Sequence, residues 1–290
     1  MKLKIGIVGF NDIGKRHYSE LRRSSVFEIC GVFDKDGCDE FCRAECFTDF
    51  KNFIETAQPQ AIVLCISANE LSEAFIQSAK YCQNILIANP IFKDIGMLKE
   101  MKYIAITNKT RVCSGMKERF NPVIKSLQKA LLRESEIYSI NISEMLLKPD
   151  ANITDEISLS NIDLAKTIIN SEIADFSCMQ TNRTNARSSD NSIINFKSKS
   201  QILVNITNSL SSQFRRFSIR VAAKNGIYFG DLINYRLYQL NENGQINFKI
   251  DTDQNEIKAQ YDAFFDLCIS GDSAELSTLD DAIKIKELFA

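Results

Sequence analysis

KLKIGIVGFNDIG, residues 2–14, is the stretch that decides the fold of this chain. Its first seven residues form an apolar, β-branched run typical of a buried strand, and a glycine-containing turn follows. A helical pattern begins at Ile13, with His17 and Leu21 on the same face. A second apolar run, residues 27–33, ends directly before Asp34. Strand, glycine turn, helix, strand and acidic residue in this order predict a dinucleotide-binding site.

The glycine turn is the expected phosphate half of that site. Gly9 and Gly14 occupy the first and third glycine positions of the G-x-G-x-x-G pattern, where glycine makes the turn and lets the helix pack on the strand. Asn11 stands at the middle position, and its side chain occupies space that a pyrophosphate would use. We expect the phosphates at the helix N-terminus, against a turn that besides the two glycines comprises Phe10, Asn11, Asp12 and Ile13.

Asp34 is the expected sugar half. It follows Gly14 by 20 residues, close to the spacing at which an acidic residue bonds the adenosine ribose. A carboxylate there repels a 2′-phosphate and favours NAD, whereas Lys35 beside it acts in the opposite direction and leaves NADP open. The alternative is an ordinary strand–helix–strand unit that binds no nucleotide.

Composition sets wider bounds. The 290 residues are 44% hydrophobic and 25% charged, as in a soluble globular protein with room for two domains. A net charge of −2 gives no electrostatic case for nucleic acid or an anionic membrane. No apolar run approaches the roughly 20 residues that span a bilayer. A strand directly after Met1 is not a signal peptide, so a cytoplasmic location is expected.

Nine cysteines are present. Cys38, Cys42 and Cys46 share a four-residue spacing, which could suggest a metal site but also fits one face of a helix after the second strand. We expect the helix and no metal, because metal sites usually use two-residue spacings or histidine, and the chain has one His. Six others lie in apolar runs and are expected to be reduced core thiols, namely Cys30, Cys65, Cys82, Cys113, Cys178 and Cys268.

Strands alternate with helices as far as Gly115, which predicts a Rossmann domain with a doubly wound parallel sheet over residues 1–115. Ligands of such sheets bind at the carboxyl ends of the strands. Besides the turn and Asp34, these ends carry Ser67, Ala68, Asn89, Pro90 and Met116.

Residues 116–290 follow another pattern, that of an α+β domain with an open, mainly antiparallel sheet. Asn225-Gly226 and Asn243-Gly244 are hairpin signals between strands at short spacing. Helices are expected after Asn121-Pro122 and over residues 161–169. Two more helices are expected within residues 256–289, and the last could return to pack on the first domain.

Several motifs together resemble the Gfo/Idh/MocA oxidoreductases, the family of glucose–fructose oxidoreductase and inositol dehydrogenase. GFNDIGKRH, residues 9–17, is similar to that family's G-x-G-x-x-G-x-x-H opening, and KERFNP, residues 117–122, to its R-R-F-N-P segment. NIDL, residues 161–164, resembles the Asp half of its H-x-x-D motif. Weaker similarities lie at residues 61–67, 85–90, 222–227 and 260–264.

The resemblance implies hydride transfer between C4 of a nicotinamide and a carbon of a small-molecule substrate, a sugar, cyclitol or sugar nucleotide. Such chemistry needs an acid–base group beside the substrate hydroxyl. In the family these groups are the E-K-P Lys and the H-x-x-D His, but this chain has Asn89 and Ser160 there. Asn89 can bond a hydroxyl but cannot exchange a proton near neutral pH, and Ser160 needs a base beside it.

Three interpretations stay open. In an active dehydrogenase, Lys117 or Asp163 carries the proton, with Lys166 one turn beyond; against this, Lys117 could be a solvated loop charge and Asp163 could pair with Arg119. In a reductase like the biliverdin reductases, which resemble this family and lack the E-K-P Lys, the substrate needs little acid–base help. The third interpretation is a non-enzyme that kept the fold, as a sensor or an assembly subunit. Family members commonly pair through the antiparallel sheet, which implies a homo-oligomer.

Overall fold

The computed structural model describes residues 2–290 except 91, 149–150, 184–187, 254 and 273–274. It divides into two compact units. The Rossmann unit comprises Met1–Lys117 and Ile257–Glu287, and the sheet unit comprises Glu118–Glu256 and Leu288–Ala290. Residues 257–287 therefore belong to the first unit, although the sequence-based boundaries placed them in the second.

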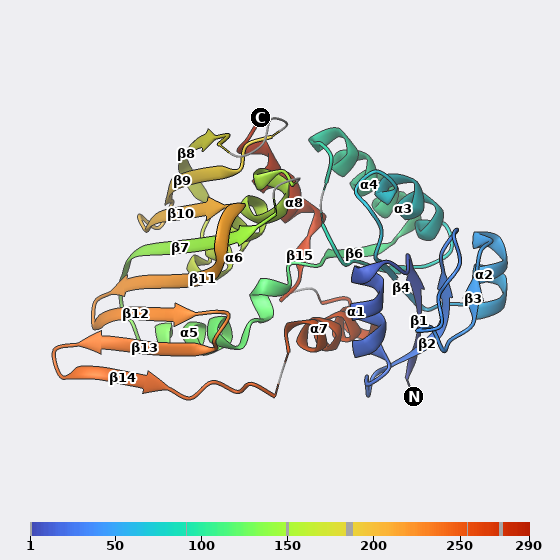
Figure 1. Ribbon diagram of the computed structural model, residues 1–290, viewed down its shortest axis with the longest axis horizontal. Coiled ribbons are helices and arrows are strands. Elements are labelled where there is room, and N and C mark those ends of the chain that lie inside the picture. The colour runs from blue at the N-terminus through green and yellow to red at the C-terminus, as the bar shows by residue number, and fades with distance from the viewer. Residues whose placement is uncertain (1, 91, 149–150, 184–187, 254, 273–274) are drawn as a thin grey trace. The chain divides into compact units, whose positions relative to one another are not determined.

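A single sheet forms the centre of the Rossmann unit (Figure 1). Its strands are β1 (Leu3–Val8), β2 (Phe27–Phe33), β3 (Cys46–Phe47), β4 (Ala61–Leu64), β5 (Asn84–Ile87), β6 (Arg111–Ser114) and β15 (Ser277–Thr278). They lie in the order β15-β6-β5-β4-β1-β2-β3. All neighbours are parallel except β15, which runs antiparallel to β6. The predicted doubly wound parallel sheet is confirmed.

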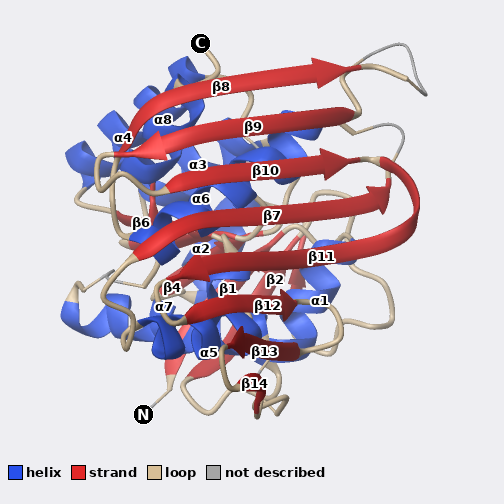
Figure 2. Cartoon of the chain, turned by 90° about the vertical axis from the view of Figure 1, so that its left-hand side faces the viewer, coloured by secondary structure: helices blue, strands red, loops and turns tan. Residues whose placement is uncertain are grey.

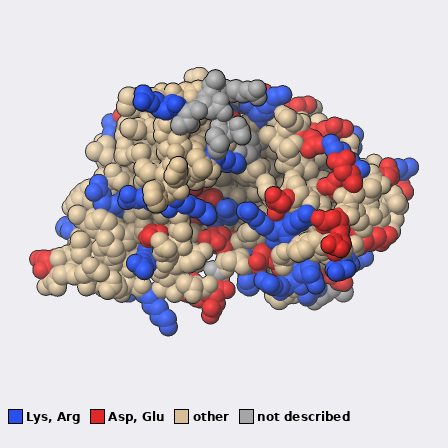
Figure 3. All heavy atoms as spheres, viewed as in Figure 1, with Lys and Arg blue, Asp and Glu red and all other residues tan. Residues whose placement is uncertain are grey.

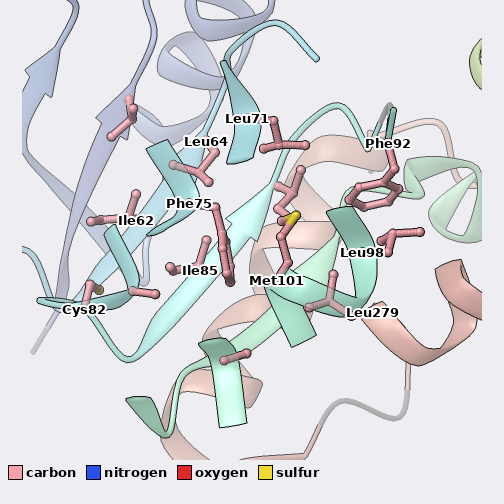
Figure 4. Close-up of a cluster of buried hydrophobic side chains, with 14 of the residues drawn as sticks. Ile62, Leu64, Leu71, Phe75, Cys82, Ile85, Phe92, Leu98, Met101 and Leu279 are labelled. Carbon is pink, nitrogen blue, oxygen red and sulfur yellow. The ribbon is translucent and has the colours of Figure 1, made fainter. Parts of the chain in front are cut away.

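Six helices of the described residues belong mainly to this unit: α1 (Asp12–Leu21), α2 (Phe50–Ala57), α3 (Leu71–Ala79), α4 (Ile95–Asn108), α7 (Glu256–Ser270) and α8 (Leu279–Glu287). Every residue of β4 is buried, as expected for a central strand covered on both faces. Figure 4 shows Phe75 of α3 against this strand, and Leu98 and Met101 of α4 near Leu279 of α8. The two C-terminal helices thus complete the core of the first unit.

Helix α7 packs on β2 through aromatic rings. The ring of Phe27 stacks on Phe264 with centroids 5.8 Å apart and meets Tyr261 edge-on at 5.9 Å. All three side chains are buried. This apolar contact holds α7 against the sheet of the Rossmann unit.

The helix expected across Cys38, Cys42 and Cys46 is absent, and that prediction was wrong. Residues 36–45 form turns and irregular backbone, and Cys38 is disulfide-bonded to Cys46 at the start of β3. The Tyr18 hydroxyl accepts hydrogen bonds from the backbone N–H groups of Arg43 and Ala44, at 2.6 and 3.1 Å. These tertiary bonds satisfy backbone groups that a helix would have used internally. The six cysteines predicted as free thiols are free.

A second sheet dominates the sheet unit. Its strands are β7 (Ile137–Leu147), β8 (Ile173–Thr181), β9 (Asn191–Ser198), β10 (Leu203–Ser209), β11 (Ser211–Ala223), β12 (Gly226–Asp231), β13 (Arg236–Asn241) and β14 (Gly244–Phe248). The order is β14-β13-β12-β11-β7-β10-β9-β8. Only β7 and β10 are parallel, and both predicted Asn-Gly hairpins are present, at β11–β12 and β13–β14. The prediction of a mainly antiparallel sheet is confirmed.

One face of this sheet is covered and the other is open. Helices α5 (Pro122–Leu131) and α6 (Leu159–Ile169), with the 3-10 helix η1 (Lys117–Phe120) and the π-helix η2 (Thr154–Ser158), complete the chain. Figure 2 shows the strands in front of α5 and α6. Ile140 and Ile142 of β7 are buried, whereas Asn141 and Ser143 between them are only partly so. Within the described ranges, no helix has the length and apolar character needed to cross a membrane.

Candidate functional site

The turn between β1 and α1 requires glycine at two places. Gly9 has φ +94°, and a Cβ there would lie 2.5 Å from the carbonyl oxygen of Cys65 at the end of β4. A Cβ on Gly14 would lie 2.2 Å from the carbonyl oxygen of Gly9. Neither contact tolerates a side chain, so the first turn of α1 is held directly against the end of β1. This is the backbone geometry expected of a phosphate-binding turn.

Asn11, at the middle glycine position, caps α1. Its Oδ1 accepts hydrogen bonds from the N–H groups of Ile13 and Gly14, at 2.9 and 3.1 Å, and its Nδ2 donates to the carbonyl oxygen of Cys65 at 2.9 Å. Free N–H groups in the first turn are the ones a helix offers to an anion. A pyrophosphate that used these two amides would have to displace the Asn11 side chain. The turn therefore fits a dinucleotide in its backbone but not with Asn11 in this rotamer.

Asp34, directly after β2, holds the turn from the other side. Its Oδ2 accepts from the N–H of Phe10 at 2.6 Å and its Oδ1 from the N–H of Asp36 at 3.0 Å. A carboxylate has about four acceptor positions, so two such bonds leave capacity for a ribose hydroxyl. The side chain is half-buried. Its expected bond to a ribose hydroxyl stays a prediction.

Phe10 lies in an aromatic cluster beside the turn. Its ring meets Tyr18 edge-on with centroids 5.4 Å apart and lies 6.4 Å from the ring of Phe41. Phe10 is buried, and Lys15 and Asp39 form an ion pair at 2.5 Å next to it. Asp12, at the first position of α1, is exposed. Of the predicted turn residues, Phe10 therefore contributes its backbone rather than an accessible side chain.

Lys35 and Ser67 converge on an acid that the sequence did not single out. Lys35 forms an ion pair with Glu70, and Ser67 Oγ donates to Glu70 Oε2 at 2.7 Å. The Lys35 hydrogen bond, followed by that of Ser67, lowers the pKa of Glu70 below its ordinary value. Ala68 is half-buried in the same loop between β4 and α3. A cofactor phosphate that used Lys35 would compete with Glu70 for it.

Asn89 and Pro90 follow β5 and are half-buried. The Asn89 amide makes no hydrogen bond within the described part of the chain. Lys117 begins η1, belongs to the same unit and is exposed. The glycine turn, Asp34, Ser67 and Asn89 all lie at carboxyl ends of strands in one sheet, as expected.

His17 is a core residue. Its Nδ1 lies 2.8 Å from the hydroxyl oxygen of Tyr261, which joins α1 to α7. Burial, assisted by the charge of Lys117, lowers the pKa of His17 to about 4. The imidazole is therefore neutral at physiological pH. It supports the helix that carries the turn.

Asp163, in the sheet unit, is paired with Arg119. Arg119 Nε and Nη2 donate to its two carboxylate oxygens at 2.6 and 2.5 Å, and the Asp163 side chain is 1% exposed. Ser160, three residues earlier, donates to the carbonyl oxygen of Ile157 at 3.1 Å. Lys166, one turn later, forms an ion pair with Glu172 at 3.6 Å. The pairing with Arg119 is the alternative that the sequence had left open for Asp163.

Two features were missed at the sequence level. Glu70 gave no signal, because its role depends on Lys35, which is 35 residues away in the chain. The cap made by Asn11 did have a signal, since Asn is among the residues most favoured directly before a helix. Among the described residues, no group of three or more His, Cys, Asp or Glu side chains is arranged to hold a metal ion.

Comparisons with known proteins agree with the fold. Residues 3–116 match the profile of GFO_IDH_MocA, an oxidoreductase family with an NAD-binding Rossmann fold. No curated protein matches the chain. Solved structures match over nearly the whole length. UDP-N-acetylglucosamine 3-dehydrogenase GnnA from Acidithiobacillus ferrooxidans has a TM-score of 0.86 at 12% identity, with 99% of this chain and 95% of that chain covered.

Two further structures carry NAD in their descriptions. An oxidoreductase from Agrobacterium radiobacter, in complex with NAD+, L-tartaric acid and magnesium, has a TM-score of 0.83 at 13% identity, with 99% and 94% covered. GenD2 from gentamicin A biosynthesis, in complex with NAD, has a TM-score of 0.82 at 14% identity, with 99% and 92% covered. At such identities the likeness shows a shared fold and nothing finer.

Proposed function

We propose that this chain, whose residues 3–116 match the Gfo/Idh/MocA oxidoreductase family, is an NAD(P)-dependent oxidoreductase acting on a sugar, cyclitol or sugar nucleotide. The observation that carries the proposal is the turn itself. Neither Gly9 nor Gly14 has room for a Cβ atom, because backbone oxygens lie too close. Asp34, at the end of the neighbouring strand, accepts a hydrogen bond from the N–H of Phe10. GnnA, a UDP-N-acetylglucosamine 3-dehydrogenase of the same fold, is the reason for including sugar nucleotides among the proposed substrates.

Each predicted site residue has a proposed task. The turn binds the pyrophosphate once Asn11 has moved, and Asp34 bonds the adenosine ribose and favours NAD over NADP. Bound NAD(P) would supply the hydride donor or acceptor. Asn89 orients a substrate or ribose hydroxyl without exchanging a proton. The cofactor would also contact the residues that follow the carboxyl ends of β4 and β5, namely Ser67, Ala68 and Pro90.

Lys117 is the proposed proton carrier. It is exposed, three residues after the end of β6 in the Rossmann unit, and the lysine side chain carries an ammonium group with three N–H donors. It could therefore deliver a proton to a carbonyl oxygen during reduction. Asp163 has both oxygens bonded to Arg119, so we assign it a positioning role through that side chain. Replacing Lys117 by Met should abolish turnover, and Lys80→Met, at an exposed lysine of the same unit, should not.

Cofactor binding is the first experiment. The chain contains no tryptophan, so the fluorescence of NADH and NADPH themselves, or calorimetry, gives the affinity without interference. We expect NADH to bind more tightly than NADPH. Asp34→Arg should reverse the order, whereas Asp36→Arg, two residues along the same loop, should change it much less. An unchanged ratio of the two affinities in Asp34→Arg would remove the assigned role of Asp34.

A second candidate function is supported by Asn11, Asn89 and Ser160 together. Asn11 caps α1, the helix proposed to bind the phosphates. Asn89 and Ser160 stand where the family resemblance implies the proton-transfer groups. The chain would then be a nucleotide sensor or an assembly subunit. Keto-sugars, UDP-sugars and a tetrapyrrole, each tested with NADH, separate the candidates: oxidation of NADH by any of them supports the enzyme. Thermal stabilisation by NADH without oxidation supports the sensor.

The homo-oligomer is also a proposal. Met179, Ile193 and Leu203 are exposed at the β8–β10 end of the open sheet face, 63%, 41% and 58% respectively. Such apolar side chains would be buried if two copies paired through this face. Leu203→Glu should then lower the sedimentation coefficient of the protein from that of a dimer to that of a monomer.

A further inference from the structure

The open face of the large sheet contains a hollow of about 690 Å³. It lies over β7 and β10–β13, in the sheet unit, and Figure 2 shows these strands from that side. Four arginines line it: Arg215, Arg216, Arg220 and Arg236. Figure 3, seen from the side of Figure 1, shows several Lys and Arg side chains on the surface of this unit. We refer to the hollow lined by these four arginines as the arginine hollow.

Strand register brings these arginines together. Arg216 and Arg220 are four residues apart on β11, so their side chains emerge on the same face. Arg220 pairs with Asn141 of β7 on one side and with Phe229 of β12 on the other. On the next strand, β13, Arg236 pairs with Asp231 of β12. Because neighbouring strands lie about 4.8 Å apart, guanidinium groups from β11 and β13 can reach one ligand over β12.

The arginine hollow carries more positive than negative charge, since four arginines and one aspartate line it. Among the described residues, none of the four guanidinium groups has a carboxylate within ion-pair distance. Asp231 is the only acid lining the hollow. Its oxygens accept from the N–H groups of Ile233 and Asn234, both at 3.0 Å, and from the Asn234 side-chain amide at 2.8 Å. Burial alone would raise the pKa of Asp231, but these hydrogen bonds and the charge of Arg236 outweigh it and lower the pKa.

The rest of the lining is suited to a small organic molecule. Asn141, Asn205 and Thr207 offer neutral hydrogen-bonding groups. Phe229 and Tyr238 stack on each other, with centroids 5.0 Å apart and ring planes 14° apart, and provide an apolar wall. The volume falls within the range usual for ligand pockets. Four arginines against one aspartate give the hollow a positive potential, and the guanidinium fork matches phosphate oxygens in pairs.

We propose that the arginine hollow binds a small phosphorylated molecule, on a face of the sheet unit that is separate from the glycine turn. This proposal does not rest on the oxidoreductase function, because none of the lining residues belongs to the Rossmann unit. It holds for a single chain and for paired copies. Two copies facing each other here would bring eight arginines together, and a bound polyanion would relieve their repulsion.

Inorganic pyrophosphate is the probe, measured by calorimetry on the full chain at low ionic strength. The test variant is Arg220→Gln with Arg236→Gln, which removes two charges and keeps long polar side chains. Arg23→Gln, at an exposed arginine of the Rossmann unit, is the control for net charge. Asn11→Asp controls for binding at the glycine turn, because it places a negative charge there. We expect the double variant to bind pyrophosphate at least about tenfold more weakly, Arg23→Gln to match the original chain, and Asn11→Asp to lose clearly less affinity than the double variant.

Circular dichroism, and a sedimentation coefficient unchanged from the original chain, would show that the double variant is folded and assembled as before. Three results would overturn the proposal. One is no pyrophosphate binding at millimolar concentration, and another is an equal loss of affinity in Arg23→Gln or Asn11→Asp. The third is a double variant that dissociates into monomers but keeps its pyrophosphate affinity, which would make the face an interface between copies instead.

Discussion

Asn11 Oδ1 lies 3.1 Å from the backbone nitrogen of Gly14 and accepts its hydrogen bond, so the middle residue of the glycine turn caps the helix that the turn serves. The same oxygen takes the N–H of Ile13, and the amide nitrogen bonds Cys65 at the end of β4. An amide oxygen thus accepts from the N–H groups that the proposed nucleotide would use for a phosphate oxygen. Nucleotide binding must then work against these three hydrogen bonds.

Replacing Asn11 by Gly should therefore tighten NADH binding. The change frees two N–H groups for the pyrophosphate and restores the full G-x-G-x-x-G pattern. We expect the dissociation constant for NADH to fall about tenfold, equivalent to about 1.4 kcal/mol. Stability should fall by only a few tenths of a kcal/mol, because Gly is itself tolerated as a helix cap. NADH fluorescence titration and thermal unfolding measure the two effects.

Asn11→Asp is the matched control for that experiment. It keeps the size of the side chain and the cap hydrogen bonds from Ile13 and Gly14, loses the donor to the Cys65 carbonyl oxygen, and adds a negative charge where the phosphates are proposed to bind. NADH should bind it more weakly than the original chain. If Asn11→Gly bound NADH no better than Asn11→Asp, the cap would have no bearing on nucleotide affinity.

The ion pair between Arg119 and Asp163 should be important for stability. Both carboxylate oxygens are bonded, and the two side chains are 10% and 1% exposed. Asp163→Asn removes the carboxylate charge from a buried, doubly hydrogen-bonded pair, so we expect a loss of about 3 kcal/mol or more in the free energy of unfolding in urea. Asp262→Asn, which breaks the exposed pair with Lys258, should lose about 0.5 kcal/mol or less. Equal losses would contradict the distinction.

Much of the fold could be predicted because local patterns and tertiary packing agree. The apolar run of β4 is buried throughout, and Asn225-Gly226 forms the hairpin that its composition predicts. Agreement fails at Cys38, Cys42 and Cys46, where the helical spacing is real but the backbone is held by Tyr18 and a disulfide. Those constraints come from parts of the chain that a local pattern does not contain.

In the candidate site, too, local patterns could be predicted and contacts between distant residues could not. Gly9, Gly14 and Asp34 could be placed from spacing alone, because a parallel sheet brings its strand ends to one edge. The pairing of Asp163 with Arg119 could be stated only as an alternative, since 44 residues separate them in the sequence. Side-chain partners of this kind depend on packing rather than on spacing.

The disulfide between Cys38 and Cys46 offers a test of the segment that was mispredicted. It closes a loop with a sequence separation of 8, which chain-entropy arguments value at about 2.5 kcal/mol. Cys38→Ser should lower the free energy of unfolding by up to that amount under oxidising conditions. Cys42→Ser, at a free thiol in the same loop, should change it by less than about 0.5 kcal/mol. A reducing agent should remove the difference between the original chain and Cys38→Ser.

His17 should make stability depend on pH. Burial first, and the charge of Lys117 second, lower its pKa to about 4 in the folded chain, whereas the ordinary value is 6.5. The unfolded chain then binds more protons than the folded chain between these values, so stability is complete above pH 6.5 and falls as the pH decreases towards 4.

Between pH 7.5 and pH 5, this difference in protonation should remove about 2 kcal/mol from the free energy of unfolding. His17→Gln cannot titrate but can still bond the Tyr261 hydroxyl, as His17 Nδ1 does at 2.8 Å. Its stability, measured by urea unfolding at both pH values, should fall by about 2 kcal/mol less than that of the original chain. Parallel pH profiles for the two proteins would mean that the His17 imidazole is not kept neutral by burial, and that the contact between α1 and α7 is looser than the structure indicates.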